Sequence, residues 1–158
     1  MRKHDSFRAA LVEAFPKLTR DPDKLAIYVD QGSVAARLED GEPTSGFEWR
    51  YTLTAILLDF ADDTNLLAAT VIAWLKRWQP ERLANFAAGN EAIGFRVDVL
   101  DNSKADVEIT LELTEAVDIL PDGTAEYRAE PDLDTGFDGV PDATALDAIT
   151  LGGEALLP

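Results

Sequence analysis

Few side chains in this sequence could do acid–base or nucleophilic chemistry. The single histidine is His4, and there is no cysteine. A Ser-His-Asp or Cys-His arrangement needs an imidazole held against a nucleophile, whereas we expect His4 to lie exposed to solvent in a mobile terminus. No glycine-rich phosphate loop, HExxH helix or CxxC pair occurs in the sequence. The sequence therefore predicts no catalytic residue and no cofactor.

Paired carboxylates are the next candidates for chemistry. Asp59, Asp62 and Asp63 lie close together in the sequence. Two acids act as a general acid and a general base where burial in a cleft separates their pKa values, and the pattern here indicates neither burial nor a cleft. We expect Asp59 to end a strand, and Asp62 and Asp63 to lie at the positive end of a helix dipole.

One acidic stretch resembles a calcium-binding loop in the spacing of its acids, with the pattern Asp132-x-Asp134-x-Gly136-x-Asp138. An EF-hand loop needs an oxygen ligand at its fifth position, glycine at its sixth and glutamate at its twelfth. The pattern fails at all three positions, which hold Gly136, Phe137 and Ala143. A solvated acidic linker is the simpler interpretation, and whether the stretch binds a cation stays open.

The balance of charge and hydropathy limits the other classes of function. The 158 residues carry a formal net charge of −16, whereas affinity for nucleic acid comes largely from Lys and Arg that displace counterions. We therefore expect no specific nucleic-acid binding. The longest apolar stretch with helical potential is 66–75, about half the ~20 residues that span a membrane. No membrane partner is predicted.

Apolar spacing predicts a first helix over residues 6–18. One buried stripe recurs every three or four residues, at Phe7, Leu11, Phe15 and Leu18. Asp5 or Ser6 can cap the start of this helix by accepting a backbone hydrogen bond. Pro16 is expected to kink or end it, because proline removes a helical hydrogen bond.

Strand patterns follow the first helix. Alternation predicts a strand at 25–29, a turn that Gly32 permits, and a short strand at 34–38. Residues 40–46 have the composition of a turn, and a long strand follows at 47–60. Both faces of the long strand are apolar: Trp49, Tyr51, Leu53, Ala55 and Leu57 on one face, and Ile56, Leu58 and Phe60 on the other. We expect a central strand that is covered on both sides.

The second predicted helix covers residues 64–78 and ends before Pro80. Its core stripe is formed by Leu67, Val71, Trp74, Leu75 and Trp78. A second apolar strip points away from this stripe and consists of Ala68, Ala69 and Ile72. We expect the second strip to be a subunit interface. The alternative is that the helix is buried on two sides within one chain.

Strict alternation predicts a hairpin with strands at 95–99 and 107–113. A three-residue loop at 101–103 sets Val97 opposite Val107, which is expected to keep the apolar face of the hairpin dry. The other face carries the acids Asp98, Asp106, Glu108 and Glu112. Together the elements predict an α+β fold over 1–128, in which a mixed, mostly antiparallel sheet packs with two α-helices. Residues 119–128 extend this sheet through a turn at Asp122-Gly123.

The composition changes after Arg128. Residues 129–158 hold seven acids and no Lys or Arg, which is typical of an extended acidic arm rather than a second domain. Residues 147–157 have the pattern of a short hairpin that turns at Gly152-Gly153. We expect this arm to dock on a partner through its apolar residues, Ile149, Leu151, Leu156 and Leu157.

The order and spacing of several short motifs are more specific than any one of them alone. These motifs are Pro22-Asp23-x-Leu25-x-Ile27-x-Val29-Asp30-x-Gly32-Ser33, Arg50-Tyr51-Thr52-Leu53, Asp59-Phe60, Ala73-Trp74-Leu75 with Gln79-Pro80, Gly94-Phe95, and Leu111-x-Leu113-Thr114-Glu115. In this order they resemble the tail completion protein R (GpR) family of temperate bacteriophages with contractile tails. None of them is a catalytic signature.

The resemblance implies a non-enzymatic virion protein with a fold similar to that of tail terminators. It would complete the head-proximal end of a tail as a homo-hexameric ring, assembled in the host bacterial cytoplasm. Its partners would be further copies of itself, a tail tube or sheath protein, and a neck or head-completion protein. DNA would pass through the ring, with Asp98, Asp106, Glu108 and Glu112 lining the passage and repelling phosphates. The alternative is a small acidic cytoplasmic enzyme or adaptor domain.

Overall fold

The computed structural model describes residues 2–37, 46–83, 92–99, 103–128, 150–151 and 154–155. The elements in chain order are α1 (Arg2–Ala14), α2 (Lys17–Arg20), the 3₁₀ turn η1 (Pro22–Lys24), β1 (Leu25–Arg37), β2 (Gly46–Phe60), α3 (Thr64–Trp78), the 3₁₀ turn η2 (Pro80–Leu83), β3 (Gly94–Val99), β4 (Ala105–Ile119), β5 (Ala125–Tyr127), β6 (Thr150–Leu151) and β7 (Glu154–Ala155).

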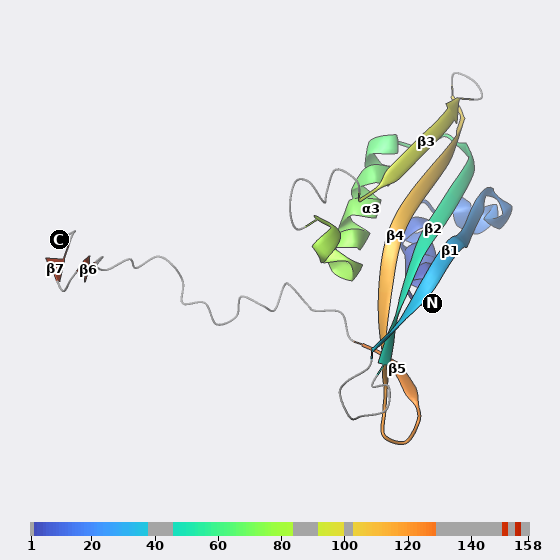
Figure 1. Ribbon diagram of the computed structural model, residues 1–158. Coiled ribbons are helices and arrows are strands. Elements are labelled where there is room, and N and C mark those ends of the chain that lie inside the picture. The colour runs from blue at the N-terminus through green and yellow to red at the C-terminus, as the bar shows by residue number, and fades with distance from the viewer. Residues whose placement is uncertain are drawn as a thin grey trace.

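A twisted, five-stranded antiparallel sheet forms the centre of the fold, with strand order β1-β2-β4-β3 and with β5 paired to β4 (Figure 1). The buried side chains of α1 and α3 join those of β2 and β4 in one hydrophobic cluster. Both long helices therefore pack on the same face of the sheet. The predicted α+β class is confirmed.

Helix α3 has the predicted bounds because strong local signals define both of its ends. The Asp63 carboxylate accepts a hydrogen bond from the Asn65 backbone N–H at 2.8 Å, and Lys76 and Arg77 lie in the last turn, where cations stabilise the helix dipole. Its core stripe is buried at Leu67, Val71, Trp74 and Leu75 and half-buried at Trp78.

The predicted pairing of β3 with β4 is also confirmed. Val97 lies opposite Val107, and Asp98 lies opposite Asp106. The strict alternation of β4 buries Val107, Ile109, Leu111 and Leu113 on the helix side. Beyond β4, the chain turns at Gly123, whose φ of +84° favours glycine, and β5 pairs back as expected.

The first helix differs from the prediction at its start. Helix α1 begins at Arg2 rather than at residue 6, so Asp5 and Ser6 lie inside it and do not cap it. The effect of Pro16 is as predicted: α1 ends at Ala14, and the separate short helix α2 begins at Lys17.

The predicted turn at Gly32 is wrong. Strand β1 runs without a break from Leu25 to Arg37 along β2, with a register shift between Val29 and Gln31. A Cβ at Gly32 would lie 2.9 Å from the Arg50 carbonyl oxygen. Glycine is therefore needed at this position for close approach to the neighbouring strand and not for a turn.

The expectation that β2 is covered on both sides is also wrong. Its helix-side residues are buried, but on the other face Ile56 is only half-buried and Leu58 is exposed. The strand is irregular between Leu57 and Phe60, and Asp59 has a φ of +51°. This irregularity turns Phe60 into the core, where its ring packs edge-on to Phe15 at 5.3 Å.

Two predicted segments fall wholly or mainly outside the described residues. The turn predicted at 40–46 is described only at Gly46, which begins β2. In the acidic arm, β6 and β7 form an antiparallel pair in which Thr150 lies opposite Ala155, as the predicted hairpin requires. None of the described helices is long and apolar enough to cross a membrane.

Candidate functional site

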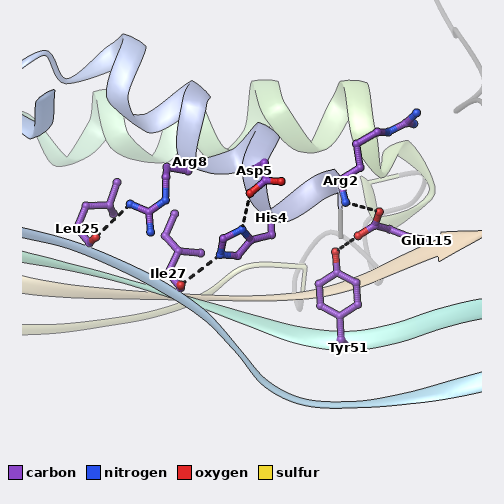
Figure 2. Close-up of polar contacts among 8 residues, drawn as sticks. All are labelled: Arg2, His4, Asp5, Arg8, Leu25, Ile27, Tyr51 and Glu115. Atoms are coloured by element: carbon purple, nitrogen blue, oxygen red, sulfur yellow. Dashed lines mark hydrogen bonds and ion pairs between the residues drawn. The ribbon is translucent and has the colours of Figure 1, made fainter. Parts of the chain in front are cut away.

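The polar groups under the helices serve to hold α1 against the sheet. Glu115, which is 3% exposed, projects from β4 toward the start of α1 (Figure 2). Its carboxylate accepts a hydrogen bond from the Arg2 backbone N–H at 2.8 Å and another from the Tyr51 hydroxyl. An anion at this point stabilises both the unpaired N–H groups and the positive end of the helix dipole. A strand therefore caps α1.

The Arg2 side chain extends the same anchor to two other elements. Its guanidinium carbon lies 5.2 Å from the centre of the Trp78 ring and 5.6 Å from that of Tyr127. Such cation–π contacts tie α1 to the end of α3 and to β5. Burial raises the pKa of Tyr127, the Glu115 carboxylate raises it further, and Arg2 acts in the opposite direction.

A second buried cluster closes a gap along the outer edge of β4. Strand β3 pairs with β4 as far as Thr110, and β5 begins its pairing at Val117. Between them, Gln79 Oε1 accepts the Thr114 backbone N–H at 3.1 Å, and Lys3 Nζ donates to the Thr114 carbonyl at 2.8 Å. Lys3 and Gln79 are each 1% exposed and are bonded to each other at 3.0 Å.

Side chains of α1 close the edge of the sheet at β1. His4 Nε2 lies 3.2 Å from the Ile27 carbonyl oxygen, and the Arg8 guanidinium donates to the Leu25 carbonyl at 3.3 Å (Figure 2). The expectation of a mobile, exposed His4 is therefore wrong: the residue lies in a helix and its side chain is only 26% exposed. Its role in the fold is to occupy a strand edge.

The opposite edge of the sheet is uncovered. Phe95, Val97 and Val99 of β3 point to the helix side but are 55%, 39% and 71% exposed. Nearby on α3, the predicted interface strip is also uncovered, since Ala68, Ala69 and Ile72 are all exposed. Helix α3 is therefore not buried on two sides within one chain. The strip stays a predicted subunit interface.

The four acids proposed to line a DNA passage lie on the helix-free face of the β3–β4 hairpin, but their surroundings differ. Glu112 pairs with Arg82 at 3.2 Å, and Glu108 lies opposite Arg96. Asp106 is half-buried and accepts the Asp59 backbone N–H at 2.9 Å. Asp98 is exposed and lies directly opposite Asp106.

The other acids have the structural roles that their positions predict. Asp59 pairs with Lys24 at 3.4 Å at the end of β2, and Asp62 pairs with Lys17 at 2.5 Å. In the described part of the chain, no group of three or more His, Asp or Glu side chains is arranged to hold a metal ion. The acidic stretch at 132–139 and the arm residues Ile149, Leu156 and Leu157 lie outside the described residues, and of Leu151 only the backbone is described.

Two hollows on the described surface are candidate binding sites. One, of about 360 Å³, lies on the helix-free face beside Arg50, Arg82 and Glu112. The other, of about 580 Å³, lies between α1 and α3 and is floored by Trp74 and Trp78. Neither brings a nucleophile, a base and an orienting group together as covalent catalysis requires.

Comparison with known proteins shows which family this chain belongs to. The family model of P2 phage tail completion protein R (GpR) matches residues 1–132. Tail completion protein R of Escherichia phage P2 is 40% identical over 115 residues, which are 73% of this chain and 72% of that protein. The chain belongs to the GpR tail completion family. No solved structure matches.

Membership of the GpR family decides between the two classes of function. The chain is a phage tail component that is assembled in the host cell, and it is not an enzyme. The alternative of a small cytoplasmic enzyme or adaptor is therefore wrong. Three residues of the family motifs, Tyr51, Gln79 and Glu115, belong to the two buried clusters that anchor α1 and close the edge of β4. These motifs therefore stabilise the fold.

Sequence reasoning missed the residues that close the sheet from α1. Lys3, His4 and Arg8 all bond to groups on strands, yet a short basic segment gives no local signal for such contacts. The available signal was the motif containing Glu115, a charged residue at a helix-facing position of an alternating strand. An acid at such a position predicts a buried polar partner.

Proposed function

We propose that this protein completes the head-proximal end of a phage tail as a homo-hexameric ring that joins the tail tube or sheath to the neck. Membership of the GpR tail completion family carries this proposal. Its partners are further copies of itself, the tube or sheath protein, and a neck or head-completion protein. The single chain supports this function with exposed apolar surface and a helix-free sheet face instead of a catalytic cleft.

The strip on α3 supplies one half of the contact between copies. A closed ring needs a head-to-tail interface, in which two different patches of the same chain meet. Ala68, Ala69 and Ile72 are exposed on a helix whose opposite face is buried, and Ile72 is 39% exposed. Full burial of an exposed Ile side chain contributes about 1.5–3 kcal/mol, so covering the exposed part of Ile72 stabilises an interface by roughly 0.6–1.2 kcal/mol.

The helix-free face of β3 and β4 faces the passage for DNA in this proposal. A net charge of −16 repels phosphate over a Debye length of about 8 Å at physiological salt. Asp98 and Asp106, opposite each other, concentrate negative charge, whereas Arg82 and Arg96 moderate it at Glu112 and Glu108. Changing Asp98, Asp106, Glu108 and Glu112 to Lys would slow DNA delivery, and their placement on the outer rim would refute this assignment.

Imaging of purified tails by electron cryomicroscopy tests the ring. We expect six copies of the chain around the tail axis at the end that meets the head. Ile72→Asp should leave the subunit folded but prevent its incorporation. Leu66→Asp is the matched control, because Leu66 is exposed on α3 outside the strip. A tail without six-fold density for this chain, or normal incorporation of Ile72→Asp, would contradict the proposal.

A further inference from the structure

In the described chain, side chains bond to parts of the sheet edge at β1 and β4, and none bonds to β3. The start of the β1 edge is occupied by His4 and Arg8, at Ile27 and Leu25, and the strand has an irregularity after Val29. The exposed part of the β4 edge is closed by Gln79 and Lys3. Among the described residues, no hydrogen bond other than those to β4 reaches β3. An uncovered strand edge is a template for another strand.

Strand β3 also lacks the features that keep an edge from pairing. Proteins blunt such edges with lysine, proline, bulges or inward-pointing charges. Strand β3 holds the sequence GFRVDV and pairs in regular register with β4. Its two charged residues, Arg96 and Asp98, point to the helix-free face, while its three apolar residues stay exposed on the helix side. The edge is regular, apolar and open.

The C-terminal arm has the properties of an added strand. Strands β6 and β7 pair only with each other, in a sheet separate from that of β3, and an isolated two-stranded hairpin is marginal in water. The segment contains Ile149, Leu151, Leu156 and Leu157 and lacks Lys and Arg. Its connection to β5, residues 129–149, reaches at most roughly 75 Å when extended at ~3.3–3.6 Å per residue.

We infer that the β3 edge of one copy receives residues 149–151 of a neighbouring copy, the first strand of its C-terminal hairpin, as an added strand. Backbone hydrogen bonds hold the strand, and the exposed Phe95, Val97 and Val99 pack against its alternate apolar side chains. The donor in this inference is a second copy, because the proposed ring places copies side by side and the connection of residues 129–149 is long enough to reach a neighbour. This inference deepens the proposed ring and rests on it for the side-by-side placement of copies.

Disulfide cross-linking of two variants tests the donor and the acceptor together. The chain contains no cysteine, so any disulfide must join introduced thiols. Full-length Val97→Cys and an affinity-tagged, full-length Leu151→Cys are mixed at high concentration and oxidised. We expect a mixed dimer of distinct mass. Val34→Cys replaces Val97→Cys in the control, because Val34 is a valine of the opposite edge strand that is 53% exposed.

The outcomes separate this inference from the ring itself. A mixed dimer with Val97→Cys but not with Val34→Cys supports docking between copies. Equal yields from both variants, or no mixed dimer, would overturn it, and so would an intrachain disulfide as the main product of the double variant Val97→Cys/Leu151→Cys. If six-fold density is present and the cross-link is absent, the ring stands and strand docking fails. If the cross-link forms and six-fold density is absent, the ring is refuted and strand docking between two copies stands.

Discussion

The two edges of the sheet are built in opposite ways. At β1, His4 and Arg8 of α1 occupy the carbonyl groups of Ile27 and Leu25, so the start of this edge is already bonded within the chain. At β3, an alternating apolar strand lies uncovered, with Val99 at 71% exposed. The difference shows that the N-terminal helix covers the start of one edge strand and leaves the other edge strand open. In the proposed ring, the open strand is the one that receives a neighbouring copy.

Among the variants that test how the sheet edges are closed, Gln79→Ala is expected to lower the free energy of unfolding most. The change removes the acceptor for the Thr114 backbone N–H and for the buried Lys3 ammonium. Loss of partners for buried donors and charges should lower the free energy of unfolding by roughly 2–4 kcal/mol, measured by urea denaturation. Gln31→Ala, at an exposed position of β1, is the control and should stay within about 0.5 kcal/mol. Equal effects from both changes would contradict the role of Gln79.

Removing the closure of β1 is expected to have a smaller effect on stability but to change association. The double variant His4→Ala/Arg8→Ala frees the Ile27 and Leu25 carbonyls and should cost about 1–2 kcal/mol. Sedimentation should show new, concentration-dependent self-association through the opened edge. Glu13→Ala, at an exposed position of the same helix, should do neither. A double variant that associates no more than the native chain would show that β1 needs no closure.

A charge on the open edge should separate stability from assembly. Val97→Lys should change the free energy of unfolding by no more than about 0.5 kcal/mol, because the side chain is already partly exposed. Incorporation into tails should nevertheless fall, since lysine on an edge strand opposes pairing. Val34→Lys on β1 is the matched control and should assemble normally. If the two variants assemble equally well, the two edges do not differ in function.

The smallest effect concerns the turn that leads to β5. Hydrogen bonds from the Thr124 side chain and backbone hold the pKa of the exposed Asp122 below its ordinary value of 3.8. Because the folded pKa is lowered, the stabilisation is present above the unfolded pKa and is lost as the pH falls through the folded pKa. Thr124→Val should move the pKa of Asp122 upward in an NMR titration. An unchanged pKa would assign the shift to the backbone contact alone.

The sequence predicted those elements whose ends or register depend on residues close together in the chain. The bounds of α3 follow from the Asp63 cap and Pro80, and the β3–β4 register follows from strict alternation. The start of α1 was missed because its cap, Glu115, lies 113 residues away in sequence from Arg2. The continuity of β1 was missed because Gly32 serves close packing against Arg50, which no pattern along the chain shows.

The candidate surfaces were predicted only in part for the same reason. The spare strip on α3 was visible as a second apolar periodicity, and the structure leaves it exposed. The alternation of β3 was also visible, but it predicted an apolar face that is dry. Whether such a face is covered depends on where α3 ends relative to the sheet, and Val97 and Val107 have opposite exposures although they lie side by side.

Hydrogen exchange in the free chain and in assembled tails tests most directly whether the open edge is the assembly edge. The amides of Gly94–Val99 that are not bonded to β4 should exchange readily in the free chain and be strongly protected in the assembled tail, because an added strand engages the groups that now face solvent. Amides of Leu25–Arg37 should show the same protection in both states. Protection that appears in β1 instead, or no change in β3, would contradict the account.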